Sequence, residues 1–332
     1  METRCEAADR SQKRPFLERS GVRSRGYSAR LQRLVVSFAC DHSLSKASSR
    51  VLEHHGVEVC ESAVDRMLGE HAARAARRQP ETPAATLRAQ GGETILTGAD
   101  GTMIPTWTYR SEAADRRKAK RREFKEMRLF VAREKGSLQS SYAGGFVDME
   151  RAAACWSHCV KLAGWSARTY IHGVFDGADW IRRRFEEQFG AHGDWLVDFF
   201  HLGEYLAEAS KGACLGEDWL SSAMSRAKRS ELAETIGDLR ANLEEEGVPD
   251  EDAPVRSALR YIENRAEHLD YASAIERNLP IGSGLTEGAH RHVLHPKLKV
   301  PGAWLPSKAH NIAQLIFIRE NEGWDQFWKR AA

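Results

Sequence analysis

The stretch Glu93–Met103, ETILTGADGTM, decides the fold more than any other part of the chain. Its apolar and β-branched side chains predict a strand, and the carboxylate of Asp100 stands within it. Burying a carboxylate in a core strand costs free energy unless a charged group shares the site. A metal cation is the usual partner, because hard Mg²⁺ binds carboxylate oxygens. A single Asp is ordinarily explained as a turn or cap residue. Whether Asp100 is instead a metal ligand depends on what the other segments of the chain contribute.

Further stretches predict the rest of a sheet. Arg122–Ala132 alternates between apolar and polar residues, and Ser137–Phe146 predicts a third strand. A helix over Met149–Gly164 follows, and then come two short strands, Arg168–Phe175 and Gly193–Phe199. Three antiparallel strands, a helix and then strand–helix–strand is the order of an RNase H-like sheet. We therefore expect an α+β fold built on an RNase H-like mixed sheet.

Helical patterns precede this sheet. Apolar residues recur at helical spacing in Ala29–Cys40, in a segment that Ser43 caps and that ends at His55, and in Ser62–His71. Two short helices joined by a tight turn containing glycine resemble a helix-turn-helix, whose second helix lies in a DNA groove. Arg66 would then contact DNA. Three-helix packing without a DNA role is also common.

Helical patterns also follow the sheet, and they complete the division of the chain. We predict helices over Leu202–Cys214, Asp218–Met224, Ala227–Glu246, Val255–Asn264 and Lys308–Asn321. The expected units are a flexible basic N-terminus (1–28), a helix-turn-helix-like DNA-binding domain (29–75), a linker (76–91), an RNase H-like catalytic domain (92–200 and 281–332) and an all-helical insertion (201–280).

The composition excludes several classes of protein. The chain has 332 residues, of which 42% are hydrophobic and 29% charged, enough for a sizeable core. No stretch approaches the roughly 18 apolar residues of a membrane helix, and the N-terminus lacks the apolar core of a signal peptide. We expect no membrane partner and a bacterial cytoplasmic protein associated with the nucleoid. Nothing resembles a phosphate-binding loop, so no nucleotide cofactor is expected.

Charge is distributed unevenly, although the formal net charge is only +2. The first 35 residues carry nine Lys or Arg against four Asp or Glu, and residues 110–133 carry ten against four. Basic blocks separated from acidic ones favour a polyanionic partner. Solvated charge runs explain the same pattern equally well.

Two more acidic residues stand in unusual surroundings. Asp176 ends the predicted strand Arg168–Phe175 and is followed by Gly177. Glu287 follows the turn Gly282-Ser283-Gly284 at the start of a predicted helix, where a helix dipole alone would explain an acid. The same region supplies cations that could bind phosphate groups, namely Arg291, Lys297 and Lys299. We expect the helix to break at Pro296.

These motifs resemble those of bacterial DDE transposases, and the nearest subgroup is the Kra-type insertion-sequence family. Gly98–Pro105 and Phe175–Ile181 resemble the first two acidic motifs, and Leu196–Leu206 resembles the Asp-x-x-His segment that follows them. Gly282–Glu287 resembles the third motif, and Gly323–Trp328 is similar to the C-terminal ending. The likeness runs from about residue 27 to 330.

The resemblance implies a catalytic, metal-binding triad of Asp100, Asp176 and Glu287. It implies two Mg²⁺ ions, with Mn²⁺ as a substitute, that cleave and join DNA at the ends of an insertion sequence. Asp198 and His201 become auxiliary residues near the site, with a buried, backbone-bonded histidine as the alternative for His201. Double-stranded DNA would be the partner, bound by a homodimer or higher oligomer.

Two features favour other functions. The family has an Arg-rich helix and a Gly-Met-x-Trp turn after the third motif, whereas this chain has Lys297, Lys299 and Pro-Gly-Ala-Trp304. Lysine lacks the bidentate geometry of arginine toward phosphate, although Trp304 remains able to stack on an unpaired base. Relatives also often carry additional N-terminal sequence. The alternatives are a non-catalytic DNA-binding protein derived from a transposase and, more weakly, a structure-selective nuclease.

Overall fold

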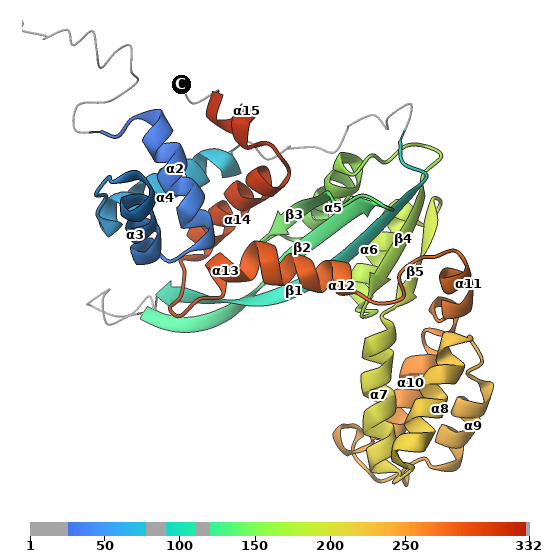
Figure 1. Ribbon diagram of the computed structural model, residues 1–332. Coiled ribbons are helices and arrows are strands. Elements are labelled where there is room, and N and C mark those ends of the chain that lie inside the picture. Colours follow the sequence, from blue (N-terminus) through green and yellow to red (C-terminus); the bar gives the residue numbers. More distant parts are fainter. Residues whose placement is uncertain (1–25, 78–90, 110–119, 330–332) are drawn as a thin grey trace, which may run out of the picture.

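A computed structural model describes residues 26–77, 91–109 and 120–329. A five-stranded sheet lies at the centre of the described part, in the order β3-β2-β1-β4-β5 (Figure 1). The strands are β1 (Thr94–Tyr109), β2 (Lys120–Glu134), β3 (Ser140–Gly145), β4 (Tyr170–Phe175) and β5 (Gly193–Val197). The first three pair antiparallel, whereas β4 is parallel to β1 and to β5. This α+β arrangement is compatible with the expected RNase H-like fold.

All five predicted strands are present, but β1 and β2 extend further than their patterns indicated. They pair from Ile95 and Glu134 to Tyr109 and Lys120 as a long antiparallel ribbon. Pro105 lies inside β1, although proline in a sheet is usually confined to edge strands, strand starts and bulges. It is tolerated because β4 pairs with β1 only as far as Thr97, so the missing N–H of Pro105 breaks no pairing on that side.

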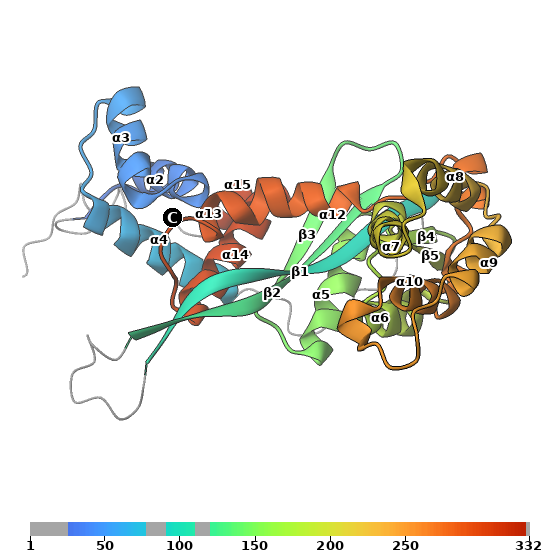
Figure 2. The ribbon, with the colours of Figure 1, turned by 90° about the horizontal axis from the view of Figure 1, so that it is seen from below.

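Helices cover both faces of the sheet (Figure 2). The helices α5 (Met149–Leu162) and α6 (Asp179–Phe189) pack on one face. There the buried Trp156 stacks on Phe130 and donates a hydrogen bond to Thr97 Oγ1 at 2.9 Å. The other face carries α12 (Gly284–Ala289), η3 (His290–Leu294), α13 (His295–Leu298) and α14 (Pro306–Glu320), and α15 (Trp324–Lys329) ends the described chain.

The three predicted N-terminal helices are confirmed as α2 (Ala29–Asp41), α3 (Leu44–His55) and α4 (Glu61–Ala76), and Ser43 caps α3. They do not form a separate core. Their buried residues join α14, α15 and one face of the sheet in a single hydrophobic cluster. The expected N-terminal tail (1–28) lies outside the described residues from 1 to 25. The expected linker (76–91) lies outside them from 78 to 90.

The long helical segment after β5 projects from one end of the sheet (Figure 1). It contains α7 (Phe199–Gly212), α8 (Gly216–Lys228), α9 (Ala233–Ala241), η1 (Asp250–Asp252), α10 (Pro254–Glu263), η2 (Ala266–His268) and α11 (Tyr271–Glu276). The single helix expected over Ala227–Glu246 is wrong. The chain turns at Ser230, whose φ of 58° is left-handed, and this separates α8 from α9.

The expected break at Pro296 is also wrong, because helical turns continue through it. The residues of η3 form a π-helix, in which His295 donates its N–H to His290 five residues earlier. Pro296 then stands in the first turn of α13, where its missing N–H is least costly. No helix in the described ranges is both long and apolar enough to cross a membrane.

Candidate active site

Asp100, Asp176 and Glu287 line one cavity of about 220 Å³, although they come from β1, the end of β4 and α12. The strand order explains two of these positions. β1 and β4 are parallel neighbours, so Asp176 emerges at the end of β4 beside the middle of β1. The remaining lining residues come from the same strands, from α7 and its N-cap, and from α12 and its N-cap: Ala99, Phe175, Asp198, Phe200, His201, Glu204, Ser283 and Thr286.

Asp100 is not buried as the strand pattern suggested, because its side chain is 48% exposed. At this point β1 pairs only with β2, so the carboxylate opens onto the cavity. The backbone N–H of Gly101 donates to Asp100 Oδ1 at 2.6 Å. The imidazole Nε2 of His290 lies 3.1 Å from Asp100 Oδ2, a pairing that the sequence pattern did not indicate.

Asp176 is held by the main chain around it. Its Oδ1 accepts a hydrogen bond from the N–H of Ala178 at 2.9 Å. Gly177 has a left-handed φ of 80°, which a residue with a side chain adopts only at a cost. The carbonyl of Asp176 accepts a hydrogen bond from the hydroxyl of Tyr261 at 2.8 Å. The turn after β4 thereby holds Asp176 at the wall of the cavity that Asp100 also lines.

Glu287 depends on close packing between α12 and β1. A Cβ atom at Gly98 would lie 2.0 Å from Thr286 Oγ1, so only glycine lets the helix approach the strand this closely. Glu287 is exposed, and its Oε1 lies 3.3 Å from Ser283 Oγ. The glycine in the first motif thus sets the height of the third acidic residue above the sheet.

Asp198 is a structural link more than a free carboxylate. It is only 4% exposed and caps α7 by accepting from the N–H of Phe200 at 2.7 Å. Its other oxygen accepts hydrogen bonds from both the N–H and the hydroxyl of Ser283. Asp198 therefore connects the end of β5 to the turn that begins α12, the helix that carries Glu287.

His201 lies on the first turn of α7 and lines the cavity. Its Nδ1 lies 3.0 Å from Glu204 Oε2, and its ring packs edge-on against Tyr205 and Tyr261. Its side chain is about one-third exposed, and the backbone bond that we considered as an alternative is not made within the described structure. Glu204 adds an acid that the sequence analysis did not select.

The carboxylates do not form a ready-made metal cage. Within the described ranges, no group of three or more His, Cys, Asp or Glu side chains is arranged to hold a metal ion. The chemistry of the donors nevertheless fits a hard cation, because all three acids supply carboxylate oxygens to one cavity. No described residue donates a hydrogen bond to Asp176 Oδ2 or Glu287 Oε2. A metal would therefore require the three side chains to converge.

A basic cavity of about 680 Å³ adjoins the acidic one and shares Asp100 and Glu287 with it. Arg291 and Lys299 supply its positive charge and are exposed. His295 also lines it, but burial and the nearby Lys299 lower the pKa of His295 to about 4, so the ring is neutral at pH 7. The two cavities place cations beside carboxylates, as a phosphate substrate with a metal requires.

Two residues expected to bind DNA are used inside the protein. Lys297 is 1% exposed, and its ammonium donates to the carbonyl of His42 at 2.8 Å, which corrects its expected contact with phosphate. The indole N–H of Trp304 donates to Leu298, and its backbone pairs with Pro105 and Trp107 of β1. Trp304 thus attaches the loop between α13 and α14 to β1, and the residue is half-buried.

The face of α4 expected in a DNA groove is partly occupied. Asp65 pairs with Lys308 of α14 at 2.6 Å, so this side of α4 faces the protein. Arg66 is exposed, and its guanidinium lies 3.7 Å from Glu70 on the same helix. Arg66 therefore still faces solvent, as do Glu61 and Ser62 in the first turn of the same helix.

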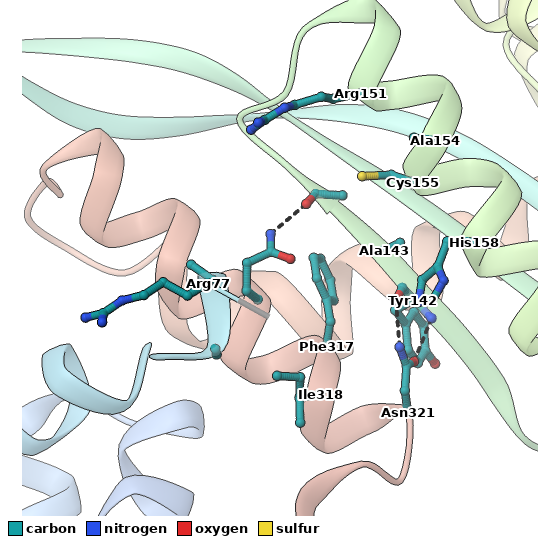
Figure 3. Close-up of a pocket in the computed structure, with 14 residues that line it drawn as sticks. Arg77, Tyr142, Ala143, Arg151, Ala154, Cys155, His158, Phe317, Ile318 and Asn321 are labelled. Carbon is teal, nitrogen blue, oxygen red and sulfur yellow. Dashed lines mark hydrogen bonds between the residues drawn. The ribbon is translucent and has the colours of Figure 1, made fainter. Parts of the chain in front are cut away.

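A further cavity, of about 630 Å³, lies between β3, α5 and α14 (Figure 3). Its described lining includes Arg77, Arg151 and Phe317 but no Asp or Glu. It therefore offers no carboxylate chemistry, and the acidic residues of interest are concentrated at the sheet end near α12.

No protein-family model matches this chain, and no curated protein matches it. Among solved structures it is similar to the "Drosophila P element transposase strand transfer complex", with 10% sequence identity and a TM-score of 0.31. The similarity covers 96% of this chain and 84% of that chain. A TM-score this low carries no argument about function, which has to come from the site itself.

Proposed function

We propose that this protein is a DNA transposase, related to the Kra-type bacterial insertion-sequence family, that cleaves and joins DNA. The observation that supports this most is the shared cavity of Asp100, Asp176 and Glu287, which come from three separate motifs in the order expected for a DDE enzyme. Two Mg²⁺ ions at these carboxylates, or Mn²⁺ in their place, would supply the Lewis acid and the activated oxygen nucleophile for phosphodiester cleavage.

The other residues of the site have supporting roles in this proposal. Asp198 holds the Ser283 turn and with it the start of α12, so that Glu287 faces the two aspartates. Arg291 and Lys299 line the adjoining cavity and would neutralise the phosphates that flank the reacting bond. His201 and Glu204 border the acidic cavity where a nucleotide would be oriented.

The partners and location belong to the same proposal. The DNA would be double-stranded and would include both the element ends and the target. Joining two ends requires at least a dimer on DNA, acting on the nucleoid in the bacterial cytoplasm without a nucleotide cofactor. The exposed Arg66 of α4 would add a contact outside the cavity.

A second candidate is a non-catalytic DNA-binding protein of transposase descent. It is favoured by the lack, within the described residues, of a preformed metal-holding group. The burial of Lys297 also favours this candidate, because its ammonium binds the carbonyl of His42 and is lost as an expected phosphate contact.

Cleavage of a labelled duplex carrying the flanks of the gene separates the two candidates. We expect wild-type protein to cut at the flank junction with Mg²⁺ but not with EDTA, and Asp176→Asn to bind the duplex without cutting it. Asp179→Asn is the matched control, because Asp179 is a neighbouring acid that is exposed and does not line the cavity. It should cut like wild type. If wild type and Asp176→Asn shift the duplex equally and neither cuts, the DNA-binding function is supported instead.

A further inference from the structure

The helical segment between β5 and α12 contacts the site through α10. α10 packs against α7, and Tyr261, near the C-terminal end of α10, reaches the turn that carries Asp176. Its hydroxyl donates to the carbonyl of Asp176 at 2.8 Å. This is a contact between residues 85 positions apart in the chain, and it fixes main chain, not the carboxylate itself.

The ring of Tyr261 is locked in place by its neighbours. It stacks on Tyr205 of α7 with ring centroids 4.0 Å apart, and His201 packs edge-on against it. A tyrosine hydroxyl is protonated near neutral pH, so that of Tyr261 is able to donate. Stacked aromatic rings lose few rotamers when they are ordered. The hydroxyl is therefore presented to the turn by a rigid support.

Arg265 holds the next peptide of the same turn. Its guanidinium lies over the Tyr261 ring, 4.1 Å from the centroid, and donates to the carbonyl of Gly177 at 3.2 Å. A Cβ atom at Gly177 would lie 2.5 Å from Arg265 Nε, so glycine is needed for this approach. Two successive carbonyls, those of Asp176 and Gly177, are thus bound by two side chains of one helical segment.

We propose that α10 and the turn after it are a positioning element for the site, in which Tyr261 and Arg265 are positioning residues that fix the turn of Asp176. The proposal deepens the proposed function, on which its metal-related part rests. The helical segment is then more than a spacer, because it fixes the turn that carries one of the three carboxylates. Groups that orient a metal ligand commonly change metal affinity when they are removed.

Tyr261→Phe tests this directly, because it removes the hydroxyl and keeps the stacked ring. Tyr205→Phe is the matched control: Tyr205 belongs to the same stack, but its hydroxyl makes no hydrogen bond with a described residue. We would measure amide hydrogen exchange in the peptide spanning Asp176 and Gly177, and Mn²⁺ binding by electron paramagnetic resonance. Thermal melting would check that each variant is folded.

We expect exchange at the turn to be about tenfold faster in Tyr261→Phe, and its Mn²⁺ dissociation constant to rise about tenfold, with Tyr205→Phe like wild type. Arg265→Gln provides a second variant with the same expected direction, should Tyr261→Phe melt early. Unchanged exchange in both Tyr261→Phe and Arg265→Gln would overturn the positioning role. Faster exchange with no Mn²⁺ binding in any of the proteins, wild type included, would support the positioning of the turn and contradict the metal chemistry.

Discussion

At the scale of single residues, the surroundings of a side chain decide whether its charge serves a ligand or the fold. Lys297 and Lys299 are two positions apart, yet Lys299 lines the basic cavity and Lys297 points inward to the carbonyl of His42. Burial lowers the pKa of Lys297 to about 8. Both carboxylate oxygens of Asp198 likewise accept hydrogen bonds, from Phe200 and Ser283. Asp176 Oδ2, by contrast, accepts none from a described residue.

Lys297 gives a prediction about pH. Between about pH 8 and the ordinary lysine pKa of 10.5, the unfolded chain binds a proton that the folded chain has released, so the stability contributed at this site rises with pH. We expect the free energy of unfolding of wild type, relative to that of Lys297→Met, to increase by at most about 3 kcal/mol from pH 7.5 to pH 10.5. Urea unfolding at both pH values measures it. A constant difference would contradict the prediction.

At the scale of elements, the site depends on how closely α12 lies on β1. Gly98 is the contact point, because Thr286 of α12 occupies the space that a larger side chain would need. The same helix continues through η3, which contains His290, and α13, which Lys299 follows, and both residues line the basic cavity with Asp100. A shift of α12 would therefore move both the acidic and the basic side of the site.

Gly98→Ala is expected to displace α12, because its Cβ would lie 2.0 Å from Thr286 Oγ1. We expect a loss of about 1–3 kcal/mol in the free energy of unfolding, as for other overpacked sites, together with reduced DNA cleavage. Gly237→Ala is the control, since Gly237 lies within α9 with open space around it. It should gain up to about 1 kcal/mol. Equal stability of the two variants in urea would show that α12 yields without cost.

At the scale of the whole molecule, the N-terminal helices complete the core of the sheet domain. Figure 1 shows α2, α3 and α4 beside α14 and α15, and their buried side chains form one cluster. Val64 and Leu68 of α4 are fully buried in it, as are Ile312 and Ile316 of α14. The two segments are far apart in sequence, but they are packed as one body.

A chain that begins at Gly91 is therefore expected not to fold cooperatively. Removing α2, α3 and α4 would expose the apolar face of α14, and each buried aliphatic side chain is worth about 1.5–3 kcal/mol. Several such losses approach the 5–15 kcal/mol by which proteins are typically stable. Thermal unfolding followed by circular dichroism is the measurement. A sharp transition like that of the full chain would instead show that the sheet and its helices fold without residues 29–75.

Local sequence patterns were enough to predict most of the helices and strands and to select the candidate acids. Helix and strand patterns are local, so the three N-terminal helices, the five strands and the cap at Ser43 could be predicted from neighbouring residues. The acids were singled out by their motifs, and their catalytic role stays a prediction. Pro296 misled the analysis because a π-turn accommodates it, an option that the local pattern does not reveal.

Only the tertiary structure decided which groups meet. The hydrogen bonds from Ser283 to Asp198, the contact of His290 with Asp100 and the grip of Tyr261 on the Asp176 turn all join residues far apart in the chain. The burial of Lys297 depends on α2 packing over α13. Such contacts follow from the packing of whole elements, and the free energy of a charge depends on the burial and partners that this packing creates.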